Sequence, residues 1–255
     1  MKRLLSFLIL VTVFGNCAFA EQIDGAEDSI TPIPKELLKN KYHVDEIQLD
    51  YEYDKRTGLI NYGGKVGLFD QQGVLVFNPN YVEISKPVPN FYLAKKDNGH
   101  FDVAYFNGRK YMFLNNIEGL DFASLDLKTC SLPVKKNGRW GLVSFDYGQI
   151  GVILPYEFDF VGKILRYKDE HDLIILRQNG EFGLLDLKTG KMLQDYSVDS
   201  IETLDELPFL KFRNGNKYAL YTVKTKKLSG YVFDNIFVDK SGRQPKVKCF
   251  LLLIF

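Results

Sequence analysis

The residues best suited to chemistry are carboxylates that follow a tyrosine by three positions. The pattern Tyr-x-x-Asp, with Ile or Val two positions later, gives Tyr42/Asp45, Tyr156/Asp159, Tyr196/Asp199 and Tyr231/Asp234. Two carboxylates acting as general acid and base need unlike environments, whereas a repeated position tends to give similar ones. Aspartates at chain bends commonly accept hydrogen bonds from backbone N–H groups. We therefore interpret these aspartates as structural caps of a repeated corner.

Other polar residues offer a weaker case for catalysis or metal binding. The acids outside the pattern that a hydrolase could use are Asp121, Asp126, Glu157 and Glu170. The three histidines, His43, His100 and His171, have no second His or Cys at metal-binding spacing. Gly58 to Lys65 faintly echoes a phosphate-binding loop, but Val66 follows the lysine where Ser or Thr is needed. The sequence predicts no catalytic, cofactor-binding or metal-binding residue, and no cofactor.

The elements that must position these residues form an internal repeat. A glycine-containing turn, usually Asn-Gly, is followed by a large apolar residue and then by a small one, as in Asn137-Gly138-Arg139-Trp140-Gly141. The large residues are Val66, Phe101, Trp140, Phe182 and Tyr218, spaced 35 to 42 residues apart. The following small residue is Gly in three copies, whereas Asp102 and Ala219 stand there in the other two.

A second turn follows the first after a short apolar run, and another apolar run follows that. Asn-Gly between two such runs is a strong signal for a β-hairpin. Adding the strand that leads into the next Asn-Gly gives about three strands per unit, and no stretch keeps a helical apolar period. We predict an all-β fold of about five stacked three-stranded hairpin units, with a β-propeller as the alternative because the units approach blade length.

The best-preserved unit resembles the bacterial WG-repeat family. The matching residues are Asn137 to Val143, the turn with Asp146 and Gly148, the apolar run Ile150 to Pro155, and Tyr156-Glu157-Phe158-Asp159. A second match is Phe182-Gly183-Leu184-Leu185-Asp186, and the other copies keep the spacing without the tryptophan. The resemblance covers most of residues 42–236. It implies β-hairpin repeats in secreted or envelope proteins and carries over no catalytic residue.

Two interpretations are open for the aromatic-glycine pairs Trp140-Gly141 and Phe182-Gly183. A glycine after the aromatic residue leaves space in which a neighbouring ring can lie against the backbone. Because the position recurs in every copy, we favour packing between units, which repeat cores require. The alternative is an exposed aromatic platform for a sugar or a peptide.

The first twenty residues have the pattern of a secretory signal peptide. Lys2 and Arg3 precede an apolar run, and Ala18-Phe19-Ala20 supplies small residues for cleavage after Ala20. Residues 21–41 then form a polar, proline-containing linker, and residues 42–255 form the repeat domain. The alternative is a lipoprotein anchored at Cys17, although Asn16 is a poor residue at that site.

Export leaves Cys130 and Cys249, an even number that permits a disulfide in an oxidising compartment, although we favour the alternative of two buried thiols in strands. The chain has 33 Lys+Arg and 32 Asp+Glu, so there is no basic field for nucleic acid. The apolar end Phe250 to Phe255 is too short for a transmembrane helix. We expect it to form either a terminal strand that covers an open edge of the array or a truncated copy of the strand that precedes each Asn-Gly turn.

The function that fits these features best is non-enzymatic. We expect an exported binding or scaffolding module whose partner is another envelope protein or a cell-wall component. The competing class is a carbohydrate-active or other hydrolase with its site between repeats. The segments that break the repeat, Leu120 to Leu127, Lys168 to Asp172 and the C-terminal run, are the expected places for specificity.

Overall fold

A computed structural model describes residues 46–49, 57–70, 72–146, 148–167, 171–205, 207–242 and 244–251. The predicted signal peptide, linker and lipidation site, together with Asp45 and Glu170, lie outside these residues. The described residues form strands, turns and a single 3-10 helix, Phe122–Ser124, and contain no α-helix. None of them belongs to a helix that is long and apolar enough to cross a membrane. The prediction of an all-β fold is confirmed.

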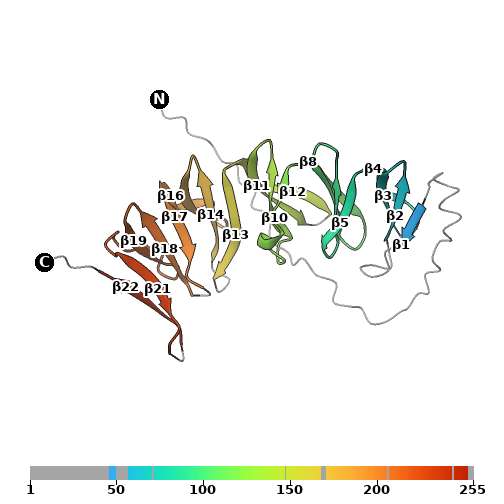
Figure 1. Cartoon of the computed structure of the whole chain (residues 1–255). Coiled ribbons are helices and arrows are strands. Elements are labelled where there is room, and N and C mark those ends of the chain that lie inside the picture. Colours follow the sequence, from blue (N-terminus) through green and yellow to red (C-terminus); the bar gives the residue numbers. More distant parts are fainter. Residues whose placement is uncertain are drawn as a thin grey trace. The chain divides into compact units, whose positions relative to one another are not determined.

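The strands form six antiparallel sheets in which consecutive strands are neighbours (Figure 1). The first sheet holds β1 (Glu46–Leu49), β2 (Thr57–Tyr62), β3 (Lys65–Asp70) and β4 (Leu75–Tyr81); the second β5 (Glu83–Val88), β6 (Phe91–Lys95), β7 (Phe101–Phe106) and β8 (Tyr111–Ile117); the third β9 (Gly119–Leu120), β10 (Ser131–Lys136), β11 (Arg139–Asp146) and β12 (Gln149–Phe158). The fourth holds β13 (Phe160–Tyr167), β14 (His171–Gln178), β15 (Glu181–Asp186) and β16 (Lys191–Val198); the fifth β17 (Ser200–Thr203), β18 (Phe209–Asn214), β19 (Lys217–Thr222) and β20 (Lys227–Leu228); the sixth β21 (Asn235–Asp239) and β22 (Lys246–Phe250).

Five of the sheets have four strands, one more than the sequence pattern predicted. The additional strand begins immediately after the acid of the Tyr-x-x-Asp pattern, as β13 does after Asp159. That pattern is therefore the end of one sheet, a single-residue bend, and the start of the next sheet. Four strands are also the number in a propeller blade, the alternative that the unit length had suggested.

The chain divides into two compact units. The described residues up to Tyr156 form the N-terminal unit, and those from Glu157 onward form the C-terminal unit. In the N-terminal unit the first three sheets pack face to face, and the ring centroids of Phe91 and Phe145, from the second and third sheets, lie 5.1 Å apart. In the C-terminal unit the fourth and fifth sheets share a core that includes Leu184 and Phe212. Each sheet thus covers an apolar face of the next within its unit.

The glycine after the aromatic residue lies directly beneath a bulge of the fourth strand. In the first sheet, three residues, Asn78, Pro79 and Asn80, stand opposite the single residue Gly67. A Cβ atom on Gly141 would lie 2.7 Å from the carbonyl oxygen of Leu154, and one on Gly67 would lie 2.8 Å from that of Phe77. The missing side chain therefore makes room for the sheet's own outer strand.

The two cysteines do not form the disulfide that the sequence permitted, because both thiols are free. Cys130 is buried in the turn before β10, with its Sγ 3.2 Å from the hydroxyl of Tyr105, whereas Cys249 is exposed on β22. The alternative of two buried thiols is therefore right only for Cys130. Strand β22 pairs with β21 and contains Phe250, the first residue of the C-terminal run, whereas residues 252–255 lie outside the described part of the chain.

We predict that Gly141→Ala lowers the free energy of unfolding by about 1–3 kcal/mol, because the new methyl group meets backbone that cannot move alone. Gly119→Ala is the matched control, since its Cβ would meet Lys135 and Trp140 at an ordinary 3.7 Å. Urea unfolding followed by circular dichroism should leave this control within about 0.5 kcal/mol of the natural chain. Equal effects of the two substitutions would contradict the role given to the bulge.

Candidate functional site

The carboxylates at the bends each bind the next Asn-Gly turn. The backbone N–H donors and their acceptors are Gly138 to Glu118 (2.9 and 3.1 Å), Gly180 to Asp159 (3.1 Å) and Gly215 to Asp199 (2.7 Å). Each turn lies 16 to 21 residues further along the chain than its acid. The acids thus bind N–H groups across their own sheet and not at their own corner. Asp234 instead accepts a hydrogen bond from Lys217 at 2.6 Å.

The tyrosines of the pattern pack within their own sheets. The Cδ1 atoms of Tyr156 and Tyr196 lie 3.0 Å from where a Cβ would stand on Gly141 and Gly183 respectively. Burial, with a contribution from the charge of Glu157, raises the pKa of Tyr196 to about 12. Burial also raises the pKa of Tyr231, whose hydroxyl is enclosed without a hydrogen-bond partner in the described part of the chain. These tyrosines cover the sheet and are not placed as proton donors to a ligand.

The aromatic residues of the repeat lie along rows within their sheets and are partly buried. The ring of Phe182 has Phe160 at 6.3 Å and the guanidinium of Arg177 at 5.7 Å. Trp140 pairs with Lys135 and reaches Gly119 on the next strand, where a Cβ would lie 3.7 Å from its Cη2 atom. The indole of the only tryptophan therefore extends past Lys135 toward Gly119, within its own sheet.

The second sheet breaks the repeat at Asp102, which stands where the first, third and fourth sheets have Gly. Here only two residues of the outer strand, Asn115 and Asn116, stand opposite Asp102, compared with three opposite Gly67 and Gly183. The shorter bulge leaves space for a side chain. That side chain carries a charge, although it is 6% exposed.

Three donors surround the Asp102 carboxylate. Lys96 lies 2.7 Å from Oδ1, which also accepts the N–H of Asn116 at 2.7 Å, and the Tyr81 hydroxyl donates to Oδ2 at 2.8 Å. Burial alone would raise the pKa of Asp102, but the hydrogen bonds from Lys96, Asn116 and Tyr81 together hold it below its usual value. Burial and the same carboxylate raise the pKa of Tyr81. The cluster therefore holds one ionised acid and one neutral phenol.

A depression opens beside this cluster in the N-terminal unit. Its volume is about 410 Å³, and its lining residues are Asn80, Tyr81, Lys96, Asp97 and Asn98. The Asp97 carboxylate pairs with Lys65, and the Asn98 side chain accepts the N–H of His100 at 3.0 Å. Carboxamide, carboxylate, ammonium and phenol groups thus face one space. Such a set can donate to and accept from several hydroxyl groups at once.

The arrangement suits binding better than acid catalysis. A general acid must keep a proton near neutral pH, whereas Asp102 is held ionised by its three donors. Among the described residues, no group of three His, Cys, Asp or Glu side chains is placed to hold a metal ion. His100 Nδ1 lies 3.2 Å from the Asn116 amide oxygen, and His171 begins strand β14.

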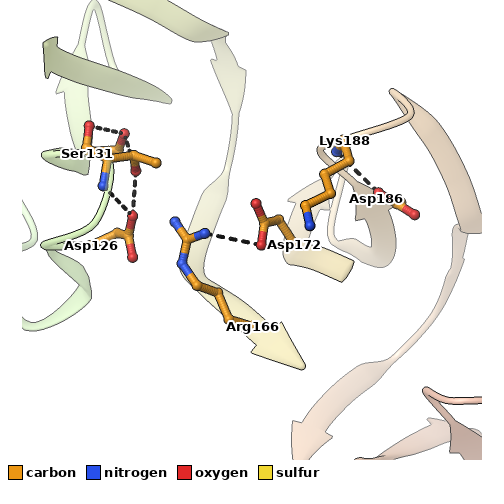
Figure 2. Close-up of polar contacts among 7 residues, drawn as sticks. Asp126, Ser131, Arg166, Asp172, Asp186 and Lys188 are labelled. Carbon is orange, nitrogen blue, oxygen red and sulfur yellow. Dashed lines mark hydrogen bonds and ion pairs between the residues drawn. The ribbon is translucent and has the colours of Figure 1, made fainter. Parts of the chain in front are cut away.

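The acids proposed for a hydrolase serve their own turns. Asp126 accepts hydrogen bonds from the N–H and hydroxyl of Thr129, and its backbone exchanges hydrogen bonds with Ser131 (Figure 2). Asp121 caps the 3-10 helix through the Ala123 N–H at 3.1 Å and the Ser124 hydroxyl at 2.6 Å. Glu157 is exposed and belongs to the C-terminal unit. Asp121 and Asp126 thus have structural partners within their own segment, and Glu157 belongs to the other unit.

Two further buried acids of the C-terminal unit, Asp172 and Asp186, stand in segments that the sequence analysis named, but neither was considered there as a candidate catalytic acid. Asp172 pairs with Arg166 at 3.1 Å across the two strands it joins (Figure 2). Asp186 accepts the N–H of Lys188 at 3.1 Å and faces the ammonium of Lys226 at 3.4 Å. Both have partners from the turn or strand beside them, as expected of structural acids.

Comparisons with known proteins do not name a family. No family model matches the chain, and no curated protein matches it. Among solved structures, the dihydro-heme d1 dehydrogenase NirN in complex with DHE has a TM-score of 0.37 at 13% identity, over 80% of this chain and 52% of that one. The extracellular domain of BT4673 from B. thetaiotaomicron has a TM-score of 0.30 at 14% identity, over 73% and 29%. The chain thus spans about half the length of the first of these proteins.

We predict that Asp102→Asn lowers the free energy of unfolding by about 1–3 kcal/mol at neutral pH, because Lys96 loses its ionic partner in a largely buried place. The pKa of Asp102 in the folded chain is below its unfolded value of about 3.9. The stabilisation by the ionised Asp102 is therefore complete above the unfolded pKa, and it disappears as the pH falls through the folded pKa. The difference between variant and natural chain should therefore shrink in acid.

Urea unfolding at neutral and at strongly acidic pH measures this difference. Asp97→Asn is the control, because it breaks an exposed ion pair worth at most about 1 kcal/mol. A difference for Asp102→Asn that is independent of pH would contradict the ionised state of this side chain.

Proposed function

We propose that this chain is an exported, non-enzymatic binding module whose ligand is a hydroxyl-rich component of the cell wall, bound in the depression beside Asp102. The observation that carries the proposal is the replacement of the repeat's glycine by a buried, ionised aspartate that holds Tyr81 and Lys96. The sheets that carry glycine at this position also have four strands, so a four-stranded sheet does not itself require the carboxylate. The export step rests on the sequence of the first twenty residues.

The chemistry of the lining supports a glycan-like ligand. Asn80 and Asn98 offer carboxamides, each with donor and acceptor atoms, and Asp97 offers a carboxylate. Sugar hydroxyls both donate and accept, so mixed groups suit them better than a field of one charge. Tyr81 adds a phenol ring that is partly exposed at the edge of the depression. The resemblance to WG repeats supports the export step of this proposal, because it implies β-hairpin repeats in secreted or envelope proteins.

The hydrolase alternative is less well supported. Asp121 and Asp126 hold their own turns, and Asp102 is held ionised by its three donors, so none of these three acids is suited to protonate a leaving group. The alternative partner, another envelope protein, would bind to the same surface. A binding experiment distinguishes the two partners, because it shows whether a glycan or a protein binds.

We predict that the mature chain binds soluble glycan fragments released from purified cell wall, and that Asn80→Ala weakens this binding about three- to tenfold, the usual effect of losing one neutral hydrogen bond. Isothermal titration calorimetry gives the affinity, and assays for new reducing ends test for hydrolysis. Asn115→Ala, an exposed amide on β8 outside the lining, should bind like the natural chain.

An unchanged affinity of Asn80→Ala for the glycan fragments would show that the depression is not the binding site. Release of reducing ends would contradict the non-enzymatic proposal and support the hydrolase alternative. Capture of an envelope protein, with no affinity for glycan fragments, would support the partner alternative and contradict the glycan ligand.

A further inference from the structure

Five Asn-Gly dipeptides lie in the described turns, and this dipeptide is chemically reactive. The backbone nitrogen of the glycine can attack the asparagine Cγ, because glycine has no Cβ to hinder the approach. A bond forms between that nitrogen and Cγ, the bond from Cγ to Nδ2 breaks, and ammonia leaves with the proton of the glycine N–H. Water then opens the succinimide ring to aspartate or isoaspartate. The five dipeptides are Asn98-Gly99, Asn107-Gly108, Asn137-Gly138, Asn179-Gly180 and Asn214-Gly215.

Three of these turns have their attacking nitrogen bound to a carboxylate. Gly138, Gly180 and Gly215 donate their N–H groups to the bend acids over 2.7 to 3.1 Å. Before it attacks, the nitrogen must give up this proton and take on negative charge. A carboxylate at hydrogen-bond distance opposes that charge by direct repulsion. The hydrogen bond also holds the turn away from the geometry of attack.

The Asn98-Gly99 turn is held less strongly. The Gly99 N–H donates to the carbonyl oxygen of Lys96 at 3.0 Å, so the acceptor is neutral. The Gly99 nitrogen is therefore held in place by a hydrogen bond, but its acceptor carries no full negative charge. Its reactivity should therefore lie between that of the carboxylate-bound turns and that of a free turn.

Asn107-Gly108 has the opposite arrangement. Its side-chain oxygen Oδ1 accepts the N–H groups of Arg109 and Lys110, each at 3.0 Å, and these donors polarise the carbonyl that is attacked. Two backbone N–H groups on one oxygen also stabilise the negative charge that develops there, as in an oxyanion hole. Gly108 is exposed at φ +89, and its N–H has no hydrogen bond within the described residues. The Arg109 and Lys110 side chains are exposed beside it.

We propose that Asn107-Gly108 is a deamidation site of the folded chain, and that the bend carboxylates protect the Asn137, Asn179 and Asn214 turns from the same reaction. Conversion of Asn107 to isoaspartate would insert an extra backbone carbon between β7 and β8 and add a negative charge. The chemistry requires water only, so it proceeds without an enzyme. A repeat that relies on Asn-Gly turns thus retains one turn that changes with age.

The test is peptide mapping by mass spectrometry after incubation of the full chain in mildly alkaline buffer, with isoaspartate detected separately by methyl transfer from an isoaspartate methyltransferase. In the folded chain, we expect Asn107 to convert about tenfold or more faster than Asn137 and Asn214, the factor that one hydrogen bond to a charged group commonly gives. In urea-unfolded chain the five sites should convert at similar rates. Equal rates in the folded chain would overturn the proposal.

Two variants test the protection itself. Glu118→Gln and Asp199→Asn replace the charged acceptor by a neutral one, in the N-terminal and C-terminal units respectively, and each should accelerate only its own turn, Asn137 or Asn214. Asp195→Asn, an exposed acid that touches no Asn-Gly turn, is the control and should change no rate. Acceleration of every site by either variant would mean general loosening of the sheet and would overturn the protective role.

Discussion

The structure depends on the close passage of the outer strand over its neighbour at the glycine that follows the large apolar residue, as at Gly67, Gly141 and Gly183. The outer strand must leave the pleat there, because it has to turn away after the next few residues and begin another sheet. A bulge achieves this change of direction, and the backbone beneath it has no room for a side chain. The glycine, the tyrosine on top of it and the acid at the bend follow from that single geometric need. The bulge and the bend that follows it therefore recur along the chain together with the strands.

The same constraint explains why the candidate site lies where it does. In the second sheet the bulge is one residue shorter, and the space it leaves is occupied by the carboxylate of Asp102. A buried charge is unfavourable unless hydrogen-bond donors surround it, and Lys96, Asn116 and Tyr81 all bind this carboxylate. Their convergence places polar groups beside the depression. The candidate site thus comes from a small departure within a regular scaffold.

Much of the fold could be predicted from sequence, because Asn-Gly turns and short apolar runs determine hairpins locally. The fourth strand could not, since Tyr-x-x-Asp reads as one corner although it spans the end of one sheet and the start of another. The partners of the acids are also invisible in sequence, as Asp159 finds Gly180 only after an entire hairpin has formed. The substitution at Asp102 is visible in the aligned copies. What it does depends on the length of a bulge, which only the register of the strands reveals.

The place of Trp140 has a practical consequence for studying this chain. It is the only tryptophan, and it lies in the third sheet, within the N-terminal unit. Its indole emission therefore reports on one half of the repeat, while the other half has only tyrosine and phenylalanine to signal its state. Comparing indole fluorescence with the circular dichroism of all strands would show whether the two units melt as one body or in sequence. The chain thus carries a built-in local probe for the cooperativity of its repeats.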